Sequence, residues 1–321
     1  MKRGDPRKPL SASIYISISG SFLTIFFLLP KSGMLTTMKT VDLSAFHEPV
    51  DDFFDSHESA ETFVSDEQLE FFNENGYLAG TRLLNEKQLE LLRSELDLLM
   101  SPEFAGDPRF YEYNSNESVD KSKRLFHALG AWRLSAGFHD LIFHRKIATV
   151  ATKLLGGQIR FWHDQLFVKP ARDGAVVAWH QDYSYWTRTK PVAHLTCWIG
   201  LDDSTTENGC LQYVPGSHRW DLLPRTDLAN DMDAVLEVLT DEQRKTFAPV
   251  AIELNAGDVS FHHPMMLHGS YENRSDRPRR AAVINVIRDG VISDSDEPLL
   301  AGIPPILKGG KIEGQFFPLI S

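Results

Sequence analysis

The chain has 321 residues, of which 42% are hydrophobic and 24% are charged, and these proportions are ordinary for a globular protein with a sizeable core. The formal net charge of −11 leaves no basic surplus to neutralise phosphates, so the composition excludes a nucleic-acid partner and a broad attraction to anionic membranes. The two cysteines, Cys197 and Cys210, form no C-x-x-C pattern, so neither a zinc site nor a disulfide framework is predicted. A single disulfide between these two cysteines is an alternative that the sequence leaves open.

The amino terminus carries basic residues followed by an apolar stretch at about 14–29. This order is typical of a signal peptide, yet no small-residue cleavage site follows, and the stretch is short for a membrane-spanning helix, which needs about 20 residues. A further interpretation is that translation begins at Met34 or Met38. We therefore expect residues 1–60 to be a poorly ordered extension, either a targeting segment or a mis-assigned start, and residues 61–321 to form a single domain.

Three helices are predicted before the first long strand. Ser65 and Gln68 have the spacing of a capping box, and Gly76 is a natural C-cap, so the first helix lies between them. Asn85 caps the second helix, in which leucines recur at helical spacing. These leucines are Leu89, Leu92, Leu96 and Leu99. A third helix is expected at about 139–155.

After residue 157 the hydrophobic period changes to that of short strands separated by turn signals. The expected strands are 159–169, 194–201, 210–214, 251–254, 259–263 and 280–287. A polar, partly helical insertion is expected at about 221–247. Several short strands with turns between them indicate a mainly β sandwich or barrel, here a jelly roll with the N-terminal helices packed outside.

His180 and Asp182 are the first candidate site residues. An H-x-D pair is a weak signal by itself, because 12 histidines and 44 acidic residues supply about one or two H-x-[DE] pairs by chance. In a strand, however, positions i and i+2 point to the same face, so both side chains could reach one metal ion. His268 lies far enough along the chain to sit on a different, facing strand. Two imidazoles and one carboxylate are the facial triad that holds Fe(II) and leaves coordination positions open.

Arg279 strengthens this interpretation because it begins an apolar strand that would carry its guanidinium inward. A buried arginine needs a partner, and a dicarboxylate offers the bidentate geometry that it prefers. His262 and His263 point to opposite faces of their strand, so at most one of them faces the cavity, and we expect packing or surface roles for both. Aromatic residues around the H-x-D pair indicate one wall of a cavity. These are Trp179, Tyr183, Tyr185 and Trp186.

Five motifs together resemble the phytanoyl-CoA dioxygenase family over about residues 63–320. They are Trp179-His-Gln-Asp-Tyr183, Trp198-Ile-Gly-Leu-Asp-Asp203, Glu207-Asn-Gly-Cys-Leu211, Pro215-Gly-Ser-His218 and His268 through Arg279. The resemblance implies a double-stranded β-helix that uses Fe(II), 2-oxoglutarate and O2. It also implies that the metal triad is His180, Asp182 and His268, and that Arg279 binds 2-oxoglutarate.

Three further residues are assigned by the resemblance. Ser270 matches a hydroxyl that helps to hold the distal carboxylate of 2-oxoglutarate. Gln165, on the strand that leads into the metal motif, matches a residue at the end of the cosubstrate nearest the iron. Trp198 matches a tryptophan that flanks the cosubstrate. The alternative for each is a packed strand residue.

These features predict an oxygenase that hydroxylates a C–H bond of a small-molecule substrate and releases succinate and CO2. Two alternatives stay open. The same cofactors could serve desaturation, epoxidation or cyclisation, or the chain could be a non-catalytic jelly-roll protein that binds a metal or a small acid. Reduced iron and an oxoacid of intermediary metabolism are available in the cytosol, which favours a cytoplasmic location, with an N-terminal signal or anchor as the alternative. The substrate itself is not identified by these residues.

Overall fold

The computed structural model of the chain describes residues 15–17, 24–26, 41–51, 53–54, 64–225 and 231–320. The chain divides into two compact units, Met1–Val41 and Asp42–Ser321. In the first unit, β1 (Tyr15–Ser17) pairs antiparallel with β2 (Thr24–Phe26). Whether translation begins at Met34 or Met38 is a question that lies outside the described residues.

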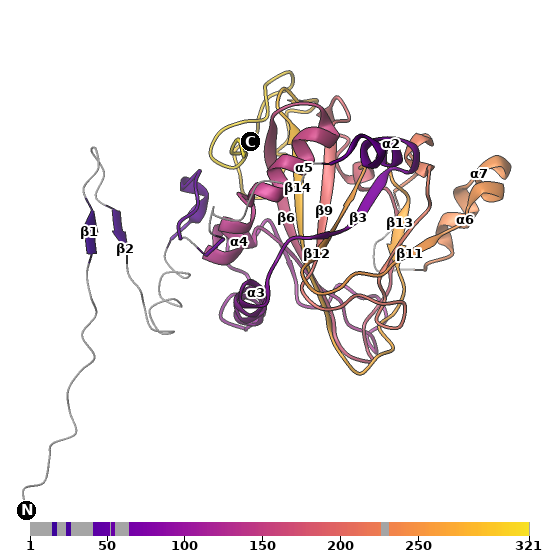
Figure 1. Cartoon of the computed structure of the whole chain (residues 1–321), viewed down its shortest axis with the longest axis horizontal. Helices are drawn as coiled ribbons and strands as arrows, with labels where there is room; N and C mark the ends of the chain where they lie inside the picture. The colour runs from indigo at the N-terminus through magenta and orange to yellow at the C-terminus, as the bar shows by residue number, and fades with distance from the viewer. Residues whose placement is uncertain are drawn as a thin grey trace, which may run out of the picture. The chain divides into compact units, whose positions relative to one another are not determined.

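The second unit is built on two antiparallel sheets, and Figure 1 labels β3, β6, β9, β12 and β14 of the larger sheet and β11 and β13 of the smaller one. The larger sheet has seven strands in the order β3-β12-β9-β14-β6-β5-β4. Their bounds are β3 (Tyr77–Arg82), β12 (Asp258–His262), β9 (His194–Gly200), β14 (Arg279–Arg288), β6 (Ile159–Lys169), β5 (Phe126–Leu129) and β4 (Glu112–Asn114). The smaller sheet has the order β11-β10-β13-β7, with β11 (Val250–Ile252), β10 (Leu211–Tyr213), β13 (His268–Ser270) and β7 (Val177–His180). A short pair joins β8 (Thr189–Lys190) to β15 (Ile292–Ser293). The predicted mainly β class with a jelly-roll core is confirmed.

The first two predicted helices form as expected. In α2 (Asp66–Asn75) the Ser65 hydroxyl accepts from the Gln68 backbone, the Gln68 side chain accepts from the Ser65 backbone, and Gly76 ends the helix at φ 81°. In α3 (Glu86–Leu99), Asn85 and Gln88 make the same reciprocal cap, and the leucine stripe is fully buried. The second unit begins before these helices, at Asp42, whereas the boundary was expected at residue 60.

The expected third helix is wrong as a single element, because the structure has two. The chain forms α4 (Ala136–Leu141) and then α5 (Arg145–Leu155). The break occurs at His144, whose extended backbone begins α5 and whose Nδ1 accepts a hydrogen bond from the Lys146 backbone. The helical spacing of apolar residues continues across the break, so periodicity alone does not show it. Helix α5 packs against β6, β9 and β14 of the larger sheet (Figure 1).

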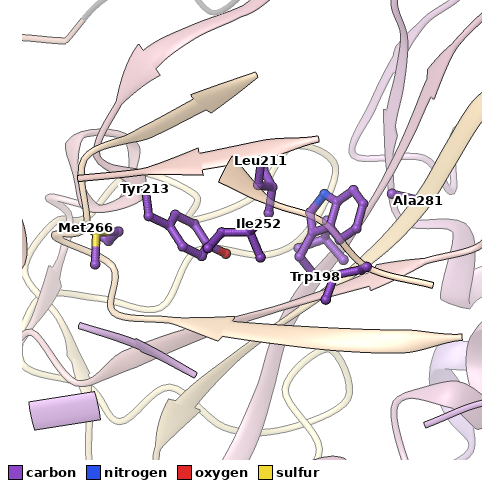
Figure 2. Packing of buried hydrophobic residues seen from close by; sticks show 8 residues of the cluster. Trp198, Leu211, Tyr213, Ile252, Met266 and Ala281 are labelled. Carbon is purple, nitrogen blue, oxygen red and sulfur yellow. The ribbon is translucent and has the colours of Figure 1, made fainter. Parts of the chain in front are cut away.

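Between the two sheets lies a buried cluster that supports the walls of the barrel. Figure 2 shows Leu211, Tyr213 and Ile252 of the smaller sheet beside Trp198 and Ala281 of the larger one. The Tyr213 ring is fully buried, and its hydroxyl bonds to Ser260 Oγ at 2.8 Å, so the cluster carries a polar contact into the core. Interlocking side chains of this kind hold the sheets at a fixed separation.

The expected polar insertion contains two short helices, α6 (Ala234–Val238) and α7 (Asp241–Thr246). Val235 and Leu239 of this region pack with Trp179 of β7, so the insertion covers the outer side of the smaller sheet. Within the ranges described above, no helix is both long enough and apolar enough to cross a bilayer.

Candidate functional site

His180 and Asp182 lie at the point where β7 ends. His180 is the last residue of the strand, and Asp182 is the first residue of a short 3-10 helix, Asp182–Tyr185. The expectation that both residues share one strand is therefore wrong. Gln181 between them keeps an extended backbone, with φ −111° and ψ 127°, so the two side chains still project to the same side. The 3-10 turn then carries the chain away from the sheet.

His268 begins β13, and its Cα pairs directly with that of His180 across the antiparallel β7–β13 ladder. The third residue of the triad thus comes from a neighbouring strand of the same sheet, whereas a facing strand was expected. The two imidazole rings lie 4.1 Å apart between centroids. Cross-strand neighbours are among the closest pairs that a sheet offers, so this register brings both rings to one point.

The ligand atoms of the three residues converge. Asp182 Oδ1 lies 3.5 Å from His180 Nε2 and 3.7 Å from His268 Nε2, and the three atoms lie within 4.8 Å of one another. His180 Nδ1 donates to the Ala178 carbonyl at 2.8 Å, and His268 Nδ1 donates to the Met266 carbonyl at 2.9 Å. Each ring therefore carries its proton on Nδ1 and turns the Nε2 lone pair towards Asp182, as a metal-binding imidazole requires.

The second oxygen of Asp182 is held by two residues that the sequence analysis did not assign to the site. Thr196 Oγ1 donates to Asp182 Oδ2 at 2.6 Å, and His262 Nε2 lies 3.0 Å from the same oxygen. His262 Nδ1 in turn bonds to the Tyr213 hydroxyl at 2.9 Å. His262 lines the cavity while His263 does not, so the two side chains point to opposite faces as expected. A packing or surface role was expected for His262, and its bond to Asp182 was not foreseen.

Burial and neighbouring charges shift the pKa values of two of these residues, Asp182 and His268. Burial opposes ionisation of Asp182, but His268, His180 and His262 outweigh it and hold the pKa of the carboxyl well below its usual value. Burial, together with the neighbouring His180 and His262, lowers the pKa of His268 well below 6.5. A neutral imidazole facing an ionised carboxylate is the state in which both can donate electron pairs to a cation.

Arg279 is the first residue of β14 and is 2% exposed. Its guanidinium carbon lies 5.3 Å from the centre of the Trp198 ring, and its Nη2 donates to Ser270 Oγ at 3.3 Å. Its Nε has no hydrogen-bond partner, and no carboxylate of the described residues lies within ion-pair distance of it. A buried guanidinium in this condition calls for an anion that the chain does not supply.

All seven predicted site residues line one cavity of about 540 Å³. They are His180, Asp182, His268, Arg279, Ser270, Gln165 and Trp198. Of the four aromatic residues expected to form a wall, Tyr185 and Trp186 line the cavity, whereas Trp179 packs on the insertion and Tyr183 bonds to the Thr189 carbonyl. The cavity therefore joins the triad to the buried arginine and to an aromatic surface.

Another polar group lines the same cavity. Glu112, Glu117 and His127 place their ligand atoms within 4.8 Å of one another, and His127 Nδ1 lies 2.9 Å from Glu117 Oε2. His127 Nε2 bonds to Gln165 Oε1 at 3.0 Å, and the His127 ring stacks on Phe167. The imidazole thus links Gln165 to the Glu117 carboxylate. Arg188 and Arg225 also line the cavity.

The donor set fits a divalent transition metal of the Fe(II) type, because it offers two imidazole Nε2 atoms and one carboxylate oxygen that converge on one point. The buried Arg279 and the Ser270 hydroxyl fit one carboxylate of an organic acid in the same cavity. Both free cysteines are buried and lie outside the residues that line the cavity, so the site has no thiolate ligand.

Comparisons with known proteins agree with this geometry. A family model described as phytanoyl-CoA dioxygenase (PhyH) matches residues 72–281. The phytanoyl-CoA dioxygenase of Arabidopsis thaliana is 26% identical over 257 residues, which cover 70% of this chain and 89% of that protein. The L-proline trans-4-hydroxylase of Streptomyces griseoviridis is 28% identical over 200 residues, which cover 54% of this chain and 75% of that protein.

A similar solved structure is that of the non-heme alpha ketoglutarate dependent carbocyclase SnoK from nogalamycin biosynthesis. It superposes with a TM-score of 0.66 at 26% identity, and the match covers 82% of this chain and 98% of that one. The likeness therefore extends over most of both molecules.

Proposed function

The chain belongs to the phytanoyl-CoA dioxygenase family and is an Fe(II)- and 2-oxoglutarate-dependent dioxygenase, and from this premise we propose the roles of its own residues. His180, Asp182 and His268 hold the iron. The single observation that carries this assignment is the convergence of His180 Nε2, Asp182 Oδ1 and His268 Nε2 in a cavity that also contains a buried arginine without a carboxylate partner among the described residues.

Arg279 and Ser270 bind the distal carboxylate of 2-oxoglutarate. The guanidinium is fixed over Trp198, which limits its motion and leaves its remaining N–H groups to face an anion. Gln165 lies on β6, where its Oε1 bonds to His127 Nε2, and it serves the cosubstrate end nearest the iron. Trp198 forms the side of the cosubstrate pocket.

The bound iron supplies the oxidative chemistry, in which 2-oxoglutarate and O2 are consumed and succinate and CO2 are released. The protein positions the reactants and excludes water. Thr196 and His262 occupy Asp182 Oδ2, so Oδ1 is the oxygen left for the metal. The Ala178 and Met266 carbonyls hold the two imidazoles in one tautomer. These contacts fix the ligand geometry before any metal arrives.

The substrate is a small molecule, and we assign hydroxylation of one of its C–H bonds as the reaction. Tyr185 and Trp186 give the cavity an aromatic side, while Leu299 and Leu300 add apolar surface. The similar L-proline trans-4-hydroxylase is named for a hydroxylation, which supports this outcome. The similar carbocyclase SnoK is named for a ring closure, which keeps cyclisation as the second candidate. Mass spectrometry of the product separates the two, because hydroxylation adds one oxygen atom and ring closure does not.

Decarboxylation of 2-oxoglutarate tests the assignment. Protein loaded with Fe(II) without oxygen, then exposed to O2 and 2-oxoglutarate, is expected to form succinate and CO2 in equal amounts. His268→Ala removes a ligand, so we expect metal affinity and turnover to fall by more than about 100-fold, beyond the effect typical of outer-shell partners. The control is His218→Ala, since His218 lies outside the cavity and bonds to the Asn73 carbonyl. Unchanged metal binding in His268→Ala would contradict the assignment.

The location and domain organisation are further parts of the proposal. We place the folded unit in the cytosol, where Fe(II) and 2-oxoglutarate are available and where free thiols such as the buried Cys197 and Cys210 persist. We also propose that residues 61–321 carry the whole catalytic site, within the compact unit that begins at Asp42. Fractionation of cells that express the full chain tests the location, and enrichment in membranes or medium would contradict it.

A further inference from the structure

Lys169 is a fully buried lysine at the end of β6, and it does not belong to the predicted site. Its Cα pairs directly with that of Arg279 across the β6–β14 ladder. Two cations therefore stand opposite each other on neighbouring strands, where like charges destabilise a sheet. The arrangement is costly in the interior, because neither charge is exposed to water.

Neither cation is neutralised by the chain. No ion pair joins Lys169 or Arg279 to a carboxylate of the described residues, and the acids that act on them electrostatically have other partners. Glu272, which acts on Lys169 electrostatically, lies 3.3 Å from the Lys123 ammonium. Asp202, which acts on Arg279, accepts from Arg280 at 2.9 Å. Burial and the neighbouring Arg279 lower the pKa of Lys169 well below its usual value, so its charged form is costly as long as the chain alone surrounds it. An anion bound at this end of the cavity would stabilise the charged forms of both residues.

The hydrogen bonds of Lys169 converge on the residue that also contacts Arg279. Lys169 Nζ donates to Ser270 Oγ at 2.6 Å, to the Ser270 carbonyl at 3.1 Å and to the Tyr271 carbonyl. Three oxygen acceptors thus match the three hydrogens of the ammonium, which has no acceptor of its own. The lysine is held in one position on the strand end that carries the serine.

These bonds determine what the Ser270 hydroxyl can do. A serine hydroxyl has one proton to donate and two lone pairs with which to accept. Ser270 Oγ accepts from Lys169 Nζ and from Arg279 Nη2, so both lone pairs are taken by cationic donors. Its own proton is left to donate, and Ser270 lines the cavity. Hydrogen bonds accepted from charged donors also make a hydroxyl a stronger donor.

We propose that Lys169 is a positioning residue for 2-oxoglutarate, which fixes the Ser270 hydroxyl as a donor to the distal carboxylate and adds a second positive charge behind Arg279. The proposal rests on the proposed cosubstrate site and extends it by one residue. Lys169 does not line the cavity, so it acts through Ser270. Room for its stem comes from Gly174, since a Cβ there would lie 2.7 Å from Lys169 Cβ.

Ligand binding tests the proposal without turnover. The Zn(II)-loaded protein is titrated calorimetrically with 2-oxoglutarate and with pyruvate, which has the same 2-oxo acid end but no distal carboxylate. In Lys169→Met we expect the Kd for 2-oxoglutarate to rise about 10- to 100-fold, the effect of losing a charge-assisted bond, while the Kd values for pyruvate and Zn(II) change less than about threefold. The matched control is Lys153→Met, since Lys153 is a half-exposed lysine of α5.

Two further variants cover the case in which Lys169→Met does not fold and test whether Lys169 acts through Ser270. Lys169→Gln keeps a donor for the carbonyl oxygens but not the charge, and the same selective loss is expected if Lys169→Met does not fold. In a Ser270→Ala background, Lys169→Met should weaken 2-oxoglutarate binding by less than in the wild type, because the hydroxyl through which it acts is gone.

The outcomes separate this proposal from the cosubstrate assignment. A wild-type protein that binds 2-oxoglutarate no better than pyruvate would contradict the roles of Arg279 and Ser270 and this proposal with them. A wild-type preference for 2-oxoglutarate that survives in Lys169→Met and Lys169→Gln would overturn the role of Lys169 alone. An equal loss of both oxoacids, or full additivity with Ser270→Ala, would also overturn it.

Discussion

The hydroxyl of Thr196 offers a sharp test of how the metal site is held. Thr196→Val removes the oxygen that lies 2.6 Å from Asp182 Oδ2 and keeps the shape and the strand preference of the side chain. A hydrogen bond to a charged group is worth about 1.5–3 kcal/mol, which corresponds to roughly 10- to 150-fold in an equilibrium constant. His262 still holds the same oxygen, so we expect the lower part of this range, about 10- to 50-fold weaker metal binding.

The measurement is an anaerobic competition between the protein and a chromophoric chelator for Fe(II), repeated with Zn(II). Thr81→Val on β3 is the matched control, because it makes the same exchange on a strand away from the cavity and should leave metal affinity unchanged. The thermal midpoint of both apo variants reports on folding. Wild-type metal affinity in Thr196→Val would refute the argument that Asp182 is oriented through Oδ2. A drop in apo stability with no selective loss of metal would point to packing instead.

Two predictions concern stability. Burial raises the pKa of Glu95 to about 7, above the usual 4.5, so the folded state favours the protonated form, and stability is lost as pH rises through 7. The comparison variant is Glu95→Gln, which keeps an acceptor for Ser135 and Gly137. Relative to this variant, the free energy of unfolding of the wild type in urea should fall by on the order of 3 kcal/mol between about pH 5 and pH 8. A difference that does not vary with pH would contradict this. Leu92→Ala, at a fully buried position of α3, should lower the unfolding free energy by about 2–5 kcal/mol with no change in metal affinity, and a cost below about 1 kcal/mol would mean that the leucine stripe is not core.

Local sequence signals predicted the elements that local chemistry controls. The caps at Ser65 and Asn85 depend on side chains within three residues of the backbone groups that they satisfy, so their spacing is visible in the chain. The long strand 159–169 has the predicted bounds, because its turn signals flank it directly. The break between α4 and α5 was missed because His144 is a rare cap and the apolar period continues across it.

The residues of the candidate site were predicted from the sequence, but their arrangement on the strands was not. His180, Asp182 and His268 have residue types and spacings that indicate a metal, yet the register that pairs β7 with β13 depends on long-range contacts. Thr196 and His262 carried no motif, since a threonine in a strand is a common packing residue. The only signal in the sequence was a polar residue within an apolar strand, and this signal does not show that the residue bonds to Asp182.

The same limit applies to Lys169. Its position at a strand end, next to Pro170 and a turn, is what a solvent-facing lysine looks like in a sequence. Only the pairing of β6 with β14 reveals that it stands opposite Arg279 and reaches Ser270. Residues whose function depends on cross-strand neighbours need the sheet register before they can be recognised.

The two carbonyl groups that hold the triad imidazoles have a consequence for how the site tolerates change. Each histidine donates to the carbonyl of the residue two positions before it, Ala178 for His180 and Met266 for His268. Main-chain carbonyls are present whatever the side chain, so substitutions at Ala178 or Met266 that preserve the backbone leave the tautomers intact. The orientation of both rings is thus protected from mutation at the positions that provide it, whereas the carboxylate between them depends on side chains that mutation can remove.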